Sequence, residues 1–278
     1  MSKKVKSDKT KPEDKTKLES TTKPEDNIKL EDVFIANPLY DPVFKYLMSD
    51  NISARKLLSA IIGKEVIELS FAPQEHVENV DVQEQSYIIC RLDFTALIRT
   101  ESGSLAVMIE VQKVHYHNDI IRFRRYLGGQ YQNKDYVYDD SEGRRHVRQI
   151  YCIFFIGDGV GIKNAPVIEI NPIAKDVTTE KNLQVQNNEF VLSLHHRSWI
   201  VQVPELKKYR RNDLERLLGI FDQTNTIENR HILNIKSEKF PKEYHPIIRR
   251  LQMAAKNEKV RNAMQAEDDI LEHFKIEE

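Results

Sequence analysis

The chain has 278 residues, with 42 Lys and Arg residues against 43 Asp and Glu residues. This length allows one large domain or two small ones, and the formal net charge of −1 gives no global attraction to nucleic acid, so a polyanion site would have to be local. The two cysteines, Cys90 and Cys152, exclude a disulfide scaffold and a four-thiolate zinc site. Their apolar sequence surroundings are typical of buried thiols in a reducing cytosol.

The first residues, MSKKVKSDK, lack the apolar stretch of a signal peptide. The longest apolar run, residues 150–156, is far too short to cross a bilayer. We therefore expect a cytoplasmic protein without a membrane partner.

Residues 1–32 differ in composition from the rest of the chain. The segment TKPEDKTKLES at residues 10–20 returns as TKPEDNIKLED at residues 22–32. Apolar residues in this region are too few to offset the entropy of ordering it. The pattern predicts a disordered, charged leader that lies outside the fold.

A helix is predicted from Asp41, which is expected to cap it, with Pro42 at the first helical position and apolar residues at helical spacing after it. A second helix is predicted over residues 53–62, where Gly63 would end it.

Residues 66–71 alternate apolar and polar side chains, which predicts a strand. Two longer strands are predicted over residues 86–99 and 104–114, joined by a tight turn. A helix over residues 119–134 and a fully buried strand over residues 148–156 follow. The order of helix, three strands, helix and strand predicts an α/β core with a mixed sheet.

Residues 191–203 would add a further strand or two. Beyond them, helices with charged outer faces are predicted over residues 205–222 and 245–274. The sequence thus divides into a core domain over residues 33–204 and a C-terminal helical region over residues 205–278. This helical region either packs on the core or stands as a subdomain.

The predicted hairpin brings two carboxylates together if its loop has an even length. Thr100 then pairs with Gly103, and continuing this register places Asp93 opposite Glu110, with Cβ atoms about 4.5–5.5 Å apart. A three-residue loop would shift the register and separate the two acids.

Two carboxylates at this distance repel one another in a partly dry site. Either one is protonated, or a cation such as Arg91 compensates, or a divalent metal bridges them. Mg²⁺ is commonly held by one or two carboxylates, and it stabilises the charge that develops on a phosphodiester. Gln112 shares the face of Glu110 and would orient the attacking water or a phosphate oxygen.

The alternative is a surface hairpin whose charged face meets solvent, with Arg91 pairing one acid. The apolar run over residues 105–109 indicates instead that the second strand is central in the sheet.

On the following helix, Arg122, Tyr126 and Gln130 form a polar stripe at i, i+4 and i+8, beside Arg125. This stripe either lines a cleft over the polar face of the sheet or forms the solvent side of the helix.

Four pieces of the chain match a known pattern in order and spacing: residues 37–45 (NPLYDPVFK), 91–94 (RLDF), 109–112 (IEVQ), and 122–131, which contains RFRRY and QY. The chain from about residue 37 to residue 155 resembles the PD-(D/E)XK nuclease superfamily. Within it, the likeness is to the transposase-like, recombination-promoting nuclease group.

The resemblance implies a restriction-endonuclease-like core that hydrolyses DNA phosphodiester bonds with Mg²⁺ or Mn²⁺ and promotes recombination. It implies that Asp93 and Glu110 bind the metal and that Gln112 occupies the place of the superfamily lysine. A lysine could stabilise transition-state charge or help deprotonate water, whereas a neutral amide can only orient. The substitution implies weak or nicking activity, or an inactive relic.

By the same resemblance, Arg122, Arg125, Tyr126 and Gln130 would position the DNA strand. Asp41 matches an early Asp of the group, although a helix cap explains it without chemistry. Basic residues concentrate in two places that either contact the phosphate backbone or are solvated and paired with nearby acids. These are Arg122, Arg124 and Arg125, and then Arg144, Arg145 and Arg148.

The sequence therefore predicts a metal-dependent DNA endonuclease. The alternative is a catalytically inactive nuclease fold that binds DNA or another protein. A homodimer formed through the C-terminal helical region is a third hypothesis.

Overall fold

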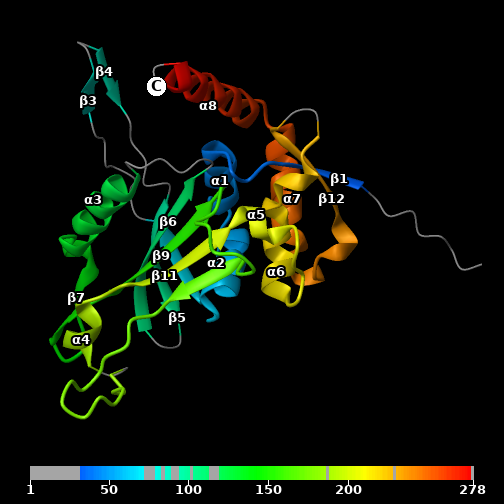
Figure 1. Ribbon diagram of the computed structural model, residues 1–278. Coiled ribbons are helices and arrows are strands. Elements are labelled where there is room, and N and C mark those ends of the chain that lie inside the picture. The colour runs from blue at the N-terminus through cyan, green and yellow to red at the C-terminus, as the bar shows by residue number, and fades with distance from the viewer. Residues whose placement is uncertain are drawn as a thin grey trace, which may run out of the picture. The chain divides into compact units, whose positions relative to one another are not determined.

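The computed structural model describes residues 32–71, 79–82, 85–88, 94–100, 103–112, 119–185, 188–227 and 230–276. Its main feature is a mixed six-stranded sheet in the order β10-β11-β9-β6-β5-β2 (Figure 1). The strands are β2 Glu68–Phe71, β5 Phe94–Thr100, β6 Gly103–Gln112, β9 Gln149–Ile156, β10 Val167–Ile170 and β11 Arg197–Gln202.

Strand directions divide this sheet into two halves. β2, β5 and β6 form an antiparallel meander, whereas β6, β9 and β11 run parallel, and β10 is antiparallel to β11. A parallel neighbour requires a crossover connection, and α3 (Asp119–Tyr131) lies in the connection between β6 and β9. The expected α/β core with a mixed sheet is confirmed.

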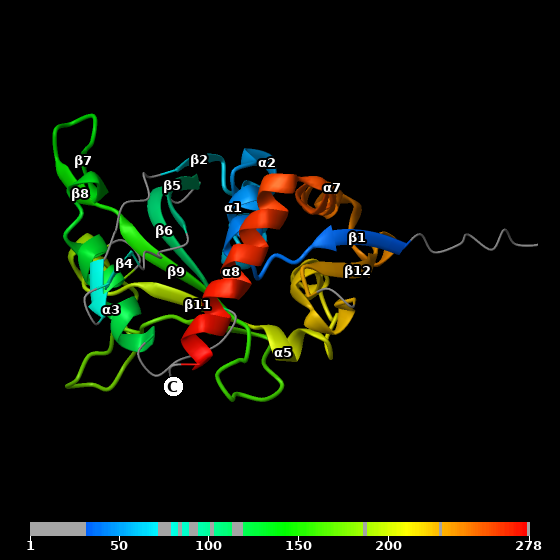
Figure 2. The same ribbon diagram turned by 90° about the horizontal axis from the view of Figure 1, so that it is seen from above.

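Helices cover both faces of the sheet (Figure 2). α1 (Asp41–Met48) and α2 (Asn51–Ile62) pack on one face, and α3 packs on the other. Alternate side chains of β6 point to opposite faces of the sheet. Val107 and Ile109 belong to the larger core, which includes α1 and α2, while Met108 belongs to a smaller core with Tyr126 of α3. β6 is an internal strand, as the apolar run before Glu110 predicted.

The C-terminal region packs on the core, which settles what the sequence left open. β12 (Ile232–Lys236) pairs with β1 (Asp32–Ala36), and α7 (His245–Lys256) packs on β1 and α1. Leu217, Phe221 and Leu251 belong to the same buried cluster as the sheet residues. Glu31–Glu278 form one compact unit.

Smaller elements complete this unit. Two hairpins form, β3 Asn79–Val82 with β4 Gln85–Ile88 and β7 Val137–Asp139 with β8 Arg145–Val147. The remaining α-helices are α4 Glu189–Ser193, α5 Val203–Leu206, α6 Asp213–Leu218 and α8 Glu258–Ile276. The 3-10 turns are Lys134–Tyr136, Gly219–Phe221, Gln223–Asn225, Ser237–Lys239 and Lys242–Tyr244.

The predicted cap of α1 is wrong. Tyr40, with φ −82° and ψ 130°, is the N-cap residue, and Asp41 is already helical. Since Asp41 lies in the first turn, its carboxylate faces along the helix and pairs with the Lys45 ammonium at 2.9 Å. α2 ends as predicted at Gly63, whose φ of 71° suits glycine.

Three predicted segments are divided by helix caps or by pairing with separate strands. The expected strand over residues 86–99 belongs to two sheets, through β4 and β5. The predicted strand over residues 191–203 begins instead as α4, because the Asn188 side chain accepts a hydrogen bond from the Val191 amide at 3.0 Å. Asn212 caps α6 in the same way and interrupts the expected helix over residues 205–222.

Among the helices of the described ranges, none is both long and apolar enough to cross a membrane. Cys152 is a buried free thiol, as expected, and its burial raises the pKa to about 12. Cys90 lies outside the described residues.

Candidate active site

The hairpin of β5 and β6 has the register that the even-length turn requires. Thr100 pairs with Gly103, and the pairing continues without a bulge to Phe94 opposite Ile109. Glu110 is the next residue of β6 after Ile109. Asp93, its predicted partner, and Arg91 lie outside the described residues, so the pair itself stays a prediction.

Glu110 is buried in the sheet. Only 5% of the residue is exposed, and it lies beside Phe154 of the parallel strand β9. By strand alternation it shares the face of Met108, which α3 covers. The alternative of a solvent-facing charged side is therefore wrong for Glu110.

The polar stripe of α3 faces the sheet at the two positions whose side chains are described. Tyr126 and Gln130 are each 4% exposed, and Tyr126 packs in the small core that contains Met108. The side chain of Arg122 is outside the description, while Arg125 is exposed. Tyr126 and Gln130 are thus not on the solvent side of the helix.

Gln130 has a partner that the sequence did not indicate. The Tyr136 hydroxyl donates a hydrogen bond to Gln130 Oε1, and both residues are buried. Burial is the main reason why the pKa of Tyr136 rises to about 12, so the hydroxyl keeps its proton at neutral pH. Because the amide oxygen of Gln130 accepts this hydrogen bond, the amide nitrogen points away from the Tyr136 hydroxyl. Tyr136 lies beyond the end of α3, where helical spacing gives no signal.

Gln112 is the last residue of β6 and pairs with Ile156 of β9. Its side chain is outside the description, so its predicted role toward water or phosphate stays a prediction.

The chemistry of Glu110 fits a hard divalent cation. A carboxylate withdrawn from water is stable as an anion only beside cations or hydrogen-bond donors, and carboxylate oxygens are the ligands Mg²⁺ prefers. No group of three or more His, Cys, Asp or Glu side chains that could hold a metal occurs in the part of the chain that the structure describes. By the resemblance, the residues that would hold a metal are Glu110 and the predicted second acid, Asp93.

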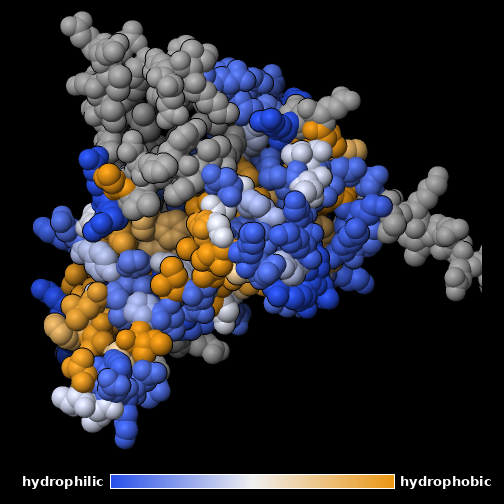
Figure 3. Space-filling model, viewed as in Figure 1, coloured by the Kyte–Doolittle hydropathy of each residue, from blue (hydrophilic) through white to orange (hydrophobic). Residues whose placement is uncertain are grey.

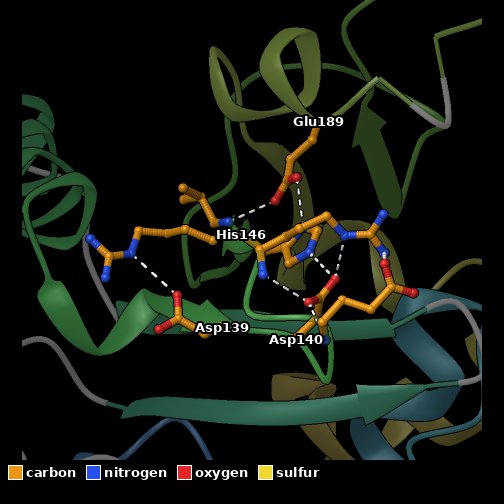
Figure 4. Close-up of polar contacts among 8 residues, drawn as sticks. Asp139, Asp140, His146 and Glu189 are labelled. Atoms are coloured by element: carbon orange, nitrogen blue, oxygen red, sulfur yellow. Dashed lines mark hydrogen bonds and ion pairs between the residues drawn. The ribbon is translucent and has the colours of Figure 1, made fainter.

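Two arginines of the second basic concentration form ion pairs within the β7–β8 hairpin (Figure 4). Arg144 contacts Asp140 at 2.9 Å and Glu142 at 3.0 Å, and Arg145 contacts Asp139 at 3.2 Å. Arg144 and Arg145 are thus paired with nearby acids, whereas Arg148 donates a hydrogen bond to the Asp135 carbonyl at 2.7 Å. The contact with a phosphate backbone stays a prediction.

His146 joins this hairpin to α4 (Figure 4). Its Nε2 lies 2.9 Å from Asp140 Oδ2, and its Nδ1 lies 2.8 Å from Glu189 Oε2. Glu189 also accepts a hydrogen bond from the Val147 amide at 2.7 Å. Hydrogen bonds to the two carboxylates raise the pKa of His146. His146 and Glu189 are 43 positions apart in the chain, so no local sequence pattern indicates these hydrogen bonds.

Apolar side chains gather over the same end of the fold (Figure 3). Phe190 and Leu194 of the α4 region are 73% and 67% exposed, and Val147 of β8 is 47% exposed.

Comparison with known proteins gives no match: no family model, curated protein or solved structure is similar enough to this chain to report.

Proposed function

We propose that the protein is a metal-dependent DNA endonuclease with a restriction-endonuclease-like core. The observation that carries the proposal is the burial of Glu110 on an internal strand, beneath a helix that turns Tyr126 and Gln130 toward the same face. Burying a carboxylate costs free energy, which a cation bound there would offset.

The order and directions of the core elements support this proposal. The core elements occur in the order helix, three antiparallel strands, helix and parallel strand: α2, β2, β5, β6, α3 and β9. This is the arrangement that the resemblance to the PD-(D/E)XK superfamily implies. The β3–β4 hairpin lies between β2 and β5, and the β7–β8 hairpin lies between α3 and β9.

In the proposed site, Asp93 and Glu110 hold Mg²⁺ or Mn²⁺. When bound, the metal makes water more acidic and stabilises negative charge on the phosphodiester. Gln112 orients the water or a phosphate oxygen, which is all a neutral amide can do there.

The DNA strand is positioned from α3. Arg122 and Arg125 contact phosphates, while Tyr126 and Gln130 shape the buried side of the site. The Tyr136 hydroxyl holds the Gln130 amide in one orientation.

A second candidate is an inactive nuclease fold that binds DNA or a protein. The hydrogen bond between Tyr136 and Gln130 favours it, since a fully structural role accounts for Gln130 without a substrate. Gln112 in the place of the superfamily lysine favours it as well.

The two candidates separate in a plasmid-nicking experiment with Mg²⁺ or Mn²⁺. The variants are Glu110→Gln and Asp93→Asn, and the matched control is Glu238→Gln, an exposed glutamate in the 3-10 turn after β12. Nicking that needs metal, survives in Glu238→Gln and disappears in the other two supports the endonuclease.

DNA binding is measured alongside by fluorescence anisotropy without divalent metal. Binding without nicking by the natural sequence supports an inactive module that binds DNA. Absence of both binding and nicking contradicts the endonuclease and the DNA-binding module and leaves a module that binds a protein. A melting curve for each variant separates loss of function from loss of fold.

A further inference from the structure

A hollow of about 550 Å³ lies on the outer side of α2, on the opposite face of the sheet from Glu110. It is bounded by α2, by the turn that follows it and by Tyr244, just before α7. Its volume lies within the range of small-molecule pockets, roughly 300–1,000 Å³. No part of the proposed nuclease site contributes to it.

The lining carries more positive than negative charge, and the positive groups lie deeper. Arg55, Lys56 and Lys64 are half-buried, whereas the two acids of the lining, Glu65 and Glu243, are exposed. Within the described residues, Lys56 forms no ion pair, whereas Arg55 interacts electrostatically with Glu68, an exposed residue of β2. The half-buried Lys56 favours an anion from solution, and Arg55 and Lys64 add positive charge beside it.

Two hydrogen bonds fix the wall of the hollow. The Val66 amide donates to Ser59 Oγ at 2.9 Å, and Arg55 Nε donates to the Val66 carbonyl at 2.7 Å. The guanidinium of Arg55 is thereby held against the backbone by one edge. A guanidinium has five N–H donors, so the remaining ones stay available for a planar or tetrahedral oxyanion.

The rest of the lining is less polar. Ile52 and Ala60 of α2 and the ring of Tyr244 form walls beside the cations. Burial, and then the Glu243 carboxylate, raise the pKa of Tyr244, so its hydroxyl remains a donor at neutral pH.

We propose that this hollow binds a small molecule in which a phosphate group is joined to an apolar or aromatic body. Arg55, Lys56 and Lys64 contact the phosphate, and Tyr244, Ile52 and Ala60 contact the body. A nucleoside monophosphate has this chemistry and serves as the probe. The proposal does not rest on nuclease activity.

The test is calorimetric titration of the full chain with AMP, adenosine and inorganic phosphate, at low salt and with a chelator present. Lys56→Glu reverses one charge of the hollow at a side chain that makes no described hydrogen bond or ion pair. Lys259→Glu makes the same charge change at an exposed position of α8 and is the matched control. Glu110→Gln tests whether AMP binds instead at the proposed nuclease site on the other face of the sheet.

We expect AMP to bind more tightly than phosphate, adenosine not to bind, and Lys56→Glu to weaken AMP binding about tenfold or more. Lys259→Glu and Glu110→Gln should leave the affinity unchanged. The proposal is overturned by the absence of AMP binding up to about 10 mM. Equal binding of adenosine and AMP, an unchanged affinity in Lys56→Glu, or a loss in Glu110→Gln would each overturn it too.

Discussion

Tyr136→Phe tests whether the buried hydrogen bond to Gln130 organises the floor of the candidate site. The substitution keeps the ring in the small core and removes only the hydroxyl that donates to Gln130 Oε1. Tyr136 is 3% exposed and Gln130 is 4% exposed, so no water replaces the lost donor without rearrangement. A lost hydrogen bond that leaves a buried acceptor unsatisfied costs about 1–3 kcal/mol.

The interaction itself can be isolated with a double-mutant cycle. Gln130→Met removes the acceptor at nearly constant volume and leaves the Tyr136 hydroxyl unsatisfied. Combining it with Tyr136→Phe removes both partners, which is often close to neutral for a buried pair. We therefore expect the double variant to lose less free energy of unfolding than the sum of the single variants, by about 1 kcal/mol.

The assay is urea denaturation followed by circular dichroism. Tyr138→Phe is the control, because Tyr138 is half-buried and its hydroxyl has no hydrogen bond among the described contacts. Its free energy of unfolding should change by no more than about 0.5 kcal/mol. The structural role of the hydrogen bond would be refuted if Tyr136→Phe also changed the free energy of unfolding by no more than about 0.5 kcal/mol. It would be refuted as well if the effects of the two single variants simply added in the double variant.

Three further predictions follow from other parts of the fold. Asp140 and Glu189 raise the pKa of His146, so the stability that His146 contributes should be complete below about pH 6.5 and should decline as the pH rises through the raised pKa. Melting temperatures measured over a pH series check this prediction. The same decline in a His146→Gln variant would contradict it. A chain ending at residue 204 should lack cooperative unfolding, since it loses side chains of the main core, and a sharp thermal transition in that fragment would refute the packing. Cys152 should react with a thiol reagent only on unfolding, because its burial raises the pKa to about 12; rapid labelling of Cys152 in the native state, mapped by mass spectrometry, would contradict this.

The register of the central hairpin was predicted on the condition of an even-length turn, and the structure has that turn. Gly103 has a φ of 118°, which glycine adopts readily, and the even turn then sets every pair from Thr100 back to Phe94. The central place of β6 followed from its apolar run, since only a strand covered on both faces keeps apolar residues in succession.

Contacts between distant segments were not predictable. β1 pairs with β12, which lies about two hundred positions later in the chain, and no sequence pattern of either strand indicates which strand it pairs with. Two hydrogen bonds depend on tertiary packing in the same way: the one between His146 and Glu189, and the one from Tyr136 to Gln130. At Asp41 the local pattern was misleading. Asp is a common capping residue, but the chain is already helical at Asp41, and Tyr40 occupies the N-cap position.

The most direct test of the central claim is calorimetric titration of Mn²⁺ into the protein and into Glu110→Gln. Glu110 is the described acid of the proposed metal pair, and the substitution removes its charge at nearly constant volume. We expect the natural sequence to bind Mn²⁺ and Glu110→Gln to lose that binding while Glu238→Gln retains it. Absence of binding in the natural sequence, or equal binding in Glu110→Gln, would contradict the proposed metal site.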